Sequence, residues 1–125
     1  LDTVHPDGTV ALSPLDRIEQ FAQGITQSLI LCAHTHLARA VRLRDGRLIV
    51  NPGSVGSPGY RDVHPFPHVV EAGTPHARYA ILELVGSAWQ VTFRHVAYDH
   101  EAMAALARRN GQPELANALA TGWIK

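Results

Sequence analysis

The stretch that most constrains the fold runs from Leu29 to Pro58 and sets two histidines between short apolar runs. The first run, Leu29 to Cys32, has the length and composition of a strand buried on both faces. It is followed by His34 and His36, and then by a hairpin pattern centred on an Asp-Gly pair. The hairpin ends in a Pro/Gly turn that can return to the histidines. This pattern is typical of a sheet that presents a metal site at its edge.

Composition is typical of one globular domain. The chain has 125 residues, 46% of them hydrophobic, and a formal net charge of zero. It has no basic excess of the kind that binds nucleic acid, whereas an anionic substrate stays compatible because a bound cation can supply positive charge. No apolar run reaches the length of a membrane span, so we expect no membrane partner. Cys32 is the only cysteine, which fits a reducing cytoplasm.

Hydrophobic spacing predicts a mixed α/β order. We expect an opening loop over 1–12, a helix from the N-cap Ser13 to near Gly24, and a hairpin of strands 41–43 and 48–50. The segment 51–75 is rich in Pro and Gly and predicts a long loop. Two further strands, 78–84 and 89–97, and two helices, 99–109 and one starting at Pro113, complete the chain.

His34 and His36 are the strongest candidates for chemistry. In an extended backbone they project to the same side, with Cβ atoms about 6 to 7 Å apart. Two imidazoles so placed can each bind one of two metal ions about 3.5 to 4 Å apart, or converge on one ion. The alternative is a pair of surface or hydrogen-bonded histidines at the end of a strand.

Other polar residues nearby allow two interpretations each. Asn51, Gly53 and Ser54 can face an anion or support the histidines, or they can form a plain turn. Arg61 can contact a phosphate through its planar guanidinium, or it can simply be solvated. The remaining histidines of the long loop are interpreted as exposed; they are His64, His68 and His76.

Three segments together resemble the calcineurin-like metallophosphoesterase superfamily, in its small bacterial and archaeal phosphodiesterase branch. They are 31–37 (Leu-Cys-Ala-His-Thr-His-Leu), 51–58 (Asn-Pro-Gly-Ser-Val-Gly-Ser-Pro) and 77–82 (Ala-Arg-Tyr-Ala-Ile-Leu). The resemblance runs in order from about Leu29 to Gly122. It implies a β-sandwich flanked by helices, with a mixed or antiparallel sheet.

The resemblance also implies an activity and its cofactors. Members of the family hydrolyse phosphomonoesters or phosphodiesters with a hydroxide that bridges two divalent ions, commonly Mn, Fe, Ni or Zn. By this resemblance His34 binds the second ion and His36 the first. Asn51, Gly53, Ser54 and Arg61 would support these ligands or face the phosphate.

The chain also departs from the family pattern. Ala33 stands where the family has glycine, and the segment 61–76 is longer than the corresponding loop. The aspartate and histidine motifs of the family's first half have no counterpart here, so no residue of this chain is assigned a certain catalytic role. We therefore interpret residues 1–125 as the C-terminal portion of a single metallophosphoesterase domain, unable to assemble the two-metal centre alone.

Two hypotheses follow from this interpretation. The first is an enzyme, a metal-dependent phosphoesterase in its full-length form, whose substrate partner is a phosphate ester. The second is a non-catalytic truncated fold that exposes a sheet edge and an apolar face, and therefore forms a homo-oligomer or binds another partner.

Overall fold

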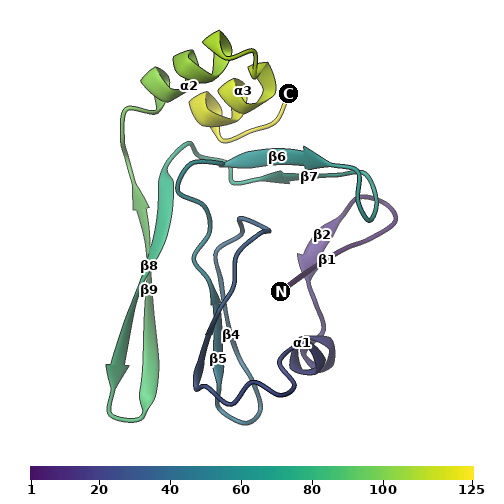
Figure 1. The fold of residues 1–125 in the computed structure, drawn as a ribbon, viewed down its shortest axis with the longest axis vertical. Helices are drawn as coiled ribbons and strands as arrows, with labels where there is room; N and C mark the ends of the chain where they lie inside the picture. The colour runs from purple at the N-terminus through teal and green to yellow at the C-terminus, as the bar shows by residue number, and fades with distance from the viewer.

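Four small sheets and three helices make up the fold, which is mixed α/β (Figure 1). The computed structural model describes all residues, 1–125. The strands are β1 (Asp2–Val4), β2 (Val10–Leu12), β3 (Leu29–Leu31), β4 (Arg39–Arg42), β5 (Leu48–Asn51), β6 (Gly59–Asp62), β7 (His68–Glu71), β8 (Ala77–Val85) and β9 (Ala88–Val96). The helices are α1 (Leu15–Phe21), α2 (His100–Arg109) and α3 (Pro113–Thr121).

The central sheet has the order β3-β5-β4, with β5 buried along its whole length. β4 and β5 form the predicted antiparallel hairpin, in which Val41 pairs with Ile49. β3 runs parallel to β5 and lies at the edge of the sheet. The prediction of a strand buried on both faces is wrong at its end, because Leu31 is 63% exposed on that edge.

Helix α1 packs on the central sheet and forms the larger of two hydrophobic clusters. Ile18 and Ala22 of the helix region meet Leu43 and Ile49 of the hairpin, all nearly fully buried. The predicted cap is wrong, because Pro14 occupies the N-cap position and no side chain caps the helix. Buried Ser13 instead shares a 2.6 Å hydrogen bond with the hydroxyl of Thr3.

The first twelve residues form a hairpin, which corrects the predicted opening loop. β1 and β2 are antiparallel, with Asp2 opposite Leu12 and Val4 opposite Val10. The turn between them is closed by the amide of Thr9, which donates to Oδ1 of Asp7 at 2.9 Å. This hydrogen bond lowers the pKa of the Asp7 carboxyl. The turn residues were recognisable, but such short strands carry too little alternation to be predicted.

The predicted long loop 51–75 also contains a hairpin. β6 and β7 are antiparallel, and Tyr60 lies opposite Val70. Pro65 lies in the connection and Pro67 just before β7, so neither proline interrupts a strand. The prolines of 51–75 all lie outside the two strands, and the prediction of a loop without strands is wrong.

The C-terminal third follows the prediction closely. β8 and β9, each of nine residues, form an antiparallel hairpin that leads into α2. Asp99 caps α2 by accepting a hydrogen bond from the amide of Ala102 at 3.0 Å, and α2 ends at the C-cap Asn110. Helices α2 and α3 pack through Ala104, Ala107, Ala116 and Leu119, a second cluster that shares no residue with the first. In Figure 1 this helix pair lies beyond the β6–β7 hairpin.

None of the three helices has the length and apolar character that crossing a membrane requires.

Substitution of two glycines tests how closely the α2–α3 pair packs against the rest of the fold. Gly111 and Gly122 both have positive φ, but only a Cβ at Gly122 would collide with backbone, lying 2.2 Å from the amide nitrogen of Thr74. We expect Gly111→Ala to lower the free energy of unfolding by about 1 kcal/mol from backbone strain alone. Gly122→Ala adds overpacking, for a total of about 3 kcal/mol. Urea denaturation of both variants measures the difference; equal losses would contradict the close packing at Thr74.

Candidate functional site

His34 and His36 lie in the connection between β3 and β4, where the backbone is not extended. Both residues have positive φ, 79° at His34 and 58° at His36. The predicted arrangement, with both side chains on the same side of a strand, is therefore wrong. Non-glycine residues with positive φ are strained by about 1 to 3 kcal/mol and persist only where the surroundings hold them. Contacts with other segments must therefore keep His34 and His36 in this conformation.

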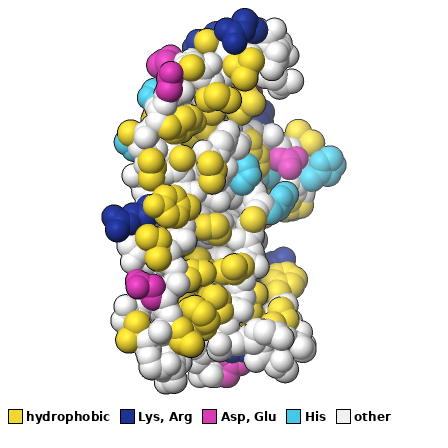
Figure 2. All heavy atoms as spheres, turned by 60° about the vertical axis from the view of Figure 1, so that its left-hand side comes forward, with side chains coloured by type: hydrophobic (Ala, Val, Ile, Leu, Met, Phe, Trp, Pro, Cys, Tyr) yellow, Lys and Arg dark blue, Asp and Glu magenta, His cyan; other side chains and the backbone are white.

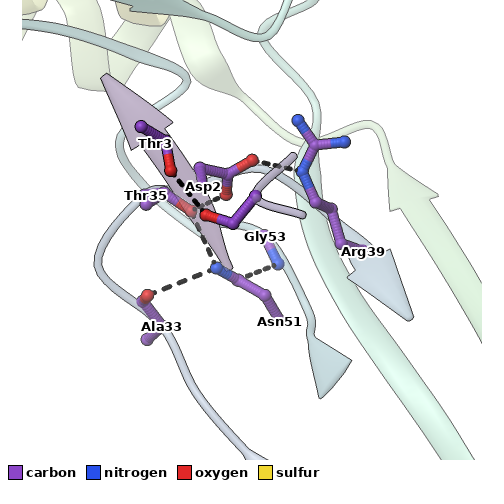
Figure 3. A network of polar contacts seen from close by, with 8 residues as sticks. Asp2, Thr3, Ala33, Thr35, Arg39, Asn51 and Gly53 are labelled. Atoms are coloured by element: carbon purple, nitrogen blue, oxygen red, sulfur yellow. Dashed lines mark hydrogen bonds and ion pairs between the residues drawn. The ribbon is translucent and has the colours of Figure 1, made fainter. Parts of the chain in front are cut away.

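Thr35, between the two histidines, is anchored by its hydroxyl (Figure 3). Its Oγ1 donates to Oδ2 of Asp2 at 2.8 Å and receives a hydrogen bond from Nδ2 of Asn51 at 3.1 Å. Asp2 belongs to β1 and Asn51 to β5, so two strands from different sheets fix this one side chain. The anchored threonine holds its neighbours in their strained conformation.

The Asp2 carboxylate is the most deeply buried charge of the site. Its side chain is 1% exposed, and its Oδ1 accepts a hydrogen bond from Nε of Arg39 on β4. The two carboxylate oxygens are thus divided between Thr35 and Arg39, as Figure 3 shows. Asp2 and Arg39 were not predicted as site residues, because nothing in the sequence pairs positions that far apart.

Asn51, the last residue of β5, is 0% exposed and contacts the histidine segment. Its Nδ2 also donates to the carbonyl of Ala33 at 3.3 Å, and its Oδ1 accepts from the amide of Gly53 at 3.0 Å. Gly53 has a φ of 90°, and an added Cβ would lie 3.0 Å from Cβ of Arg78, so glycine is required there. Ser54 Oγ accepts from the amide of Ser57 at 3.0 Å. The turn 51–54 thus lies beside the histidine segment and, through Asn51, holds it by hydrogen bonds.

His36 has one ring nitrogen fixed by the backbone. Its Nδ1 lies 3.0 Å from the carbonyl oxygen of Ser57. A carbonyl can only accept, so Nδ1 carries the proton and Nε2 keeps its lone pair. The ring also packs edge-on against Tyr60, with centroids 5.0 Å apart and planes at 70°. This imidazole is oriented as metal-binding histidines usually are, with the other nitrogen hydrogen-bonded.

A cavity of about 410 Å³ lies beside His34. Its lining includes His34 and Thr35 from the β3–β4 connection, Asp2 from β1, and Tyr60, Asp62 and His68 from the β6–β7 hairpin. Backbone hydrogen bonds from the amides of His64 and Val63 lower the pKa of Asp62. Burial raises the pKa of Tyr60, so its phenol keeps its proton. The cavity therefore joins the histidine segment to a hairpin predicted as loop.

The other sequence candidates lie at different places. The side chain of His64 is 87% exposed, as predicted for this loop. His68 corrects that prediction: it is only 8% exposed, and its Nδ1 donates to the carbonyl of Phe66 at 2.8 Å. Arg61 pairs with Glu114 of α3 at 3.3 Å and does not line the cavity. His76 is half-buried, and its carbonyl accepts from buried Arg78 at 3.3 Å.

The structure contains no group of three or more histidine, cysteine, aspartate or glutamate side chains placed to hold a metal ion. His34 and His36 are two such donors, and Asp2 is already engaged by Arg39 and Thr35. A tetrahedral zinc site requires three or four protein ligands. The residues of this chain therefore fit part of a metal site and not a whole one.

Comparison of the chain with models of known protein families found no match, and comparison with curated proteins found none either.

The Asp2–Arg39 pair can be tested by a double-mutant cycle. We expect Arg39→Leu to lower the free energy of unfolding by about 3 kcal/mol, because it leaves a buried carboxylate without its cation. Adding Asp2→Asn should recover most of this loss, since the amide still accepts from Thr35. Arg44→Leu, which removes an exposed pair with Asp16 and Glu19, is the control and should change stability little. Additive losses in the double variant would show that the two residues are not coupled.

Proposed function

We propose that this chain is the C-terminal portion of a metal-dependent phosphoesterase domain of the calcineurin-like type, with a β-sandwich architecture. His34 and His36 each contribute one ligand to a two-metal centre, and the remaining ligands come from residues outside this chain. Divalent ions such as Mn, Fe, Ni or Zn would activate a water and polarise the phosphate ester there. The proposal places the full-length protein in the cytoplasm.

The orientation of His36 carries this proposal. Its Nδ1 donates a hydrogen bond to the Ser57 carbonyl at 3.0 Å, which leaves the lone pair of Nε2 available to bind a metal ion. An ordinary surface histidine has no need of such a partner. Ser57 follows directly on the turn 51–56, so the second motif of the resemblance positions a ligand from the first.

The histidine segment is also rigid in a way that suits a binding site. Thr35 is tied to Asp2 and Asn51, and His34 and His36 keep positive φ on either side of it. Strained backbone that the surroundings enforce is common at ligand sites. Preorganised ligands lose little entropy when they bind an ion. The network of Figure 3 therefore supports a site in which the backbone that carries both histidines is fixed before the metal binds.

A second candidate function is self-association without catalysis, and a different observation favours it. Large apolar side chains are exposed on β3 and the β8–β9 hairpin, including Leu31 at 63%, Leu84 at 57% and Val85 at 54%. Figure 2 shows hydrophobic side chains running down this face of the molecule. Exposed apolar patches of this kind mark sites of protein association. The same surface would be covered in a complete domain.

Zinc titration of the native polypeptide, stripped of its metal, tests the ligand assignment, because the remaining proposed ligands lie outside the 125 residues described. We expect His36→Ala to weaken Zn²⁺ binding at least about tenfold, because a direct ligand is lost. The control is His95→Ala on β9, which lies outside the candidate site and should bind Zn²⁺ as the unsubstituted protein does. Isothermal titration calorimetry measures the affinity. Equal affinities for both variants would refute His36 as a ligand.

The mass and metal content of the native polypeptide distinguish the two functions. The enzyme proposal expects a polypeptide longer than 125 residues that carries close to two equivalents of a transition metal and hydrolyses phosphate esters. A metal-free native protein of this length that sediments as a dimer or larger species would instead support self-association. Intact mass spectrometry, elemental analysis and sedimentation velocity on one sample give the answer.

A further inference from the structure

His68 is a mostly buried residue with one ring nitrogen that no hydrogen bond within the chain uses. The residue is 8% exposed, and its Nδ1 donates to the Phe66 carbonyl at 2.8 Å. Nε2 therefore carries a lone pair. Nε2 has no hydrogen-bond partner in the structure. It is also not one of the side-chain polar atoms that are both without a partner and inaccessible to solvent. Since His68 lines the cavity beside His34, this nitrogen is open to the cavity and ready to accept a hydrogen bond.

The walls around His68 are aromatic and apolar on one side. The ring of Tyr60 stands edge-on to His68, with centroids 6.1 Å apart, and Pro65 and Phe66 complete this side of the lining. Phe66 is 38% exposed, so part of its ring is available for contact. The rest of the lining is mostly polar and includes Asp2, Arg17 and Asp62, so the aromatic contact for a small organic ring is on this side, next to the hydrogen-bond acceptor of His68.

The cavity is larger than a bare phosphate requires. At about 410 Å³ it falls within the range of cavities that hold organic ligands. His34 lies on the same cavity. An ester whose phosphate lies at His34 would therefore extend its alcohol group along Tyr60 toward His68.

We propose that this cavity binds the alcohol part of a phosphate ester, and that the preferred alcohol is a ring carrying a hydroxyl or amino group that donates to Nε2 of His68. Tyr60 and Phe66 form the wall against which the ring packs. The inference rests on the proposed function for the identity of the phosphate end, and it names the class of ester that the site prefers. His68 is then a specificity-determining residue.

The test compares ligands that differ by one hydroxyl group. The probes are 3- and 4-hydroxyphenyl phosphate, phenyl phosphate and inorganic phosphate, each titrated into the metal-free chain by calorimetry. We expect the better hydroxyphenyl ester to bind roughly fivefold tighter than phenyl phosphate, which is the worth of one hydrogen bond. Inorganic phosphate should bind more weakly than any of the ring-bearing esters.

Three variants separate the hydrogen bond from the packing. His68→Leu should abolish the preference for the hydroxyl group, so that both classes of ester bind equally. Phe66→Ala should weaken all ring-bearing esters by a similar factor and leave the hydroxyl preference in place. His95→Gln, on β9, is the matched control and should behave as the original chain. Circular dichroism checks the fold of each variant.

If His68→Leu does not fold, NMR of the His68 imidazole in the original chain tests the same hydrogen bond. The ¹⁵N resonance of Nε2 of His68 should move on binding of the hydroxyphenyl ester and remain in place with phenyl phosphate. No hydroxyl preference in the original chain, a preference that survives His68→Leu, or an unmoved Nε2 resonance would each overturn the inference.

Failure of this inference and failure of the proposed function give different results. If Zn²⁺ binding depends on His36 but no ester shows a hydroxyl preference, the cavity inference is wrong and the metal-site proposal stands. If the ester preference depends on His68 but Zn²⁺ binding does not depend on His36, the metal-site proposal is wrong and the cavity remains a site for ring-bearing ligands.

Discussion

The buried carboxylate of Asp2 is the interaction on which the candidate site depends. It lies where three segments meet, on β1, and it is engaged by Arg39 of β4 and by Thr35 of the β3–β4 connection. Breaking a buried, paired charge is costly, so the three segments are held in one relative position. Together with the hydrogen bonds from Asn51, this constraint holds the segment in which His34 and His36 have positive φ. A charge pair at the N-terminal hairpin thus sets the geometry of imidazoles more than thirty residues later in the chain.

The sequence predicts those parts of the fold that are determined locally. The Asp-Gly turn between β4 and β5 and the helix start at Asp99 are each encoded within a few neighbouring residues, and the structure contains both. The buried face of α2 is set by its packing on α3, which buries Ala104 and Ala107 and leaves Met103 and Leu106 partly exposed. The hairpins β1–β2 and β6–β7 were missed because their strands, of three or four residues, lie in segments dominated by turn residues, unlike the apolar runs of β3 and β5. In strands that short, alternation is no stronger than chance, and tertiary contacts decide the conformation.

The residues of the candidate site likewise fall into those that the sequence predicts and those that it does not. His34, His36 and Asn51 could be found from their spacing, whereas Asp2, Arg39 and His68 could not, since their partners are distant or their burial depends on a hairpin hidden in a Pro-rich segment. The expected extended geometry of the two histidines failed for a physical reason. Strand β3 ends at Leu31, and His34 and His36 lie in the connection that follows, with positive φ on either side of the anchored Thr35.

The two hydrophobic clusters share no residue, and this separation divides the site between two cooperative units. The anchors of the histidine segment lie on β1, β4 and β5, beside the cluster around Ile18. The β6–β7 wall of the cavity contacts the other unit, since Arg61 pairs with Glu114 and the amide of Ile124 donates to Glu71 at 2.8 Å. Opening of the α2–α3 pair alone would loosen that wall while the anchors of Thr35 on β1 and β5 stay in place. The two sides of the cavity would then become disordered at different temperatures, although both line one cavity.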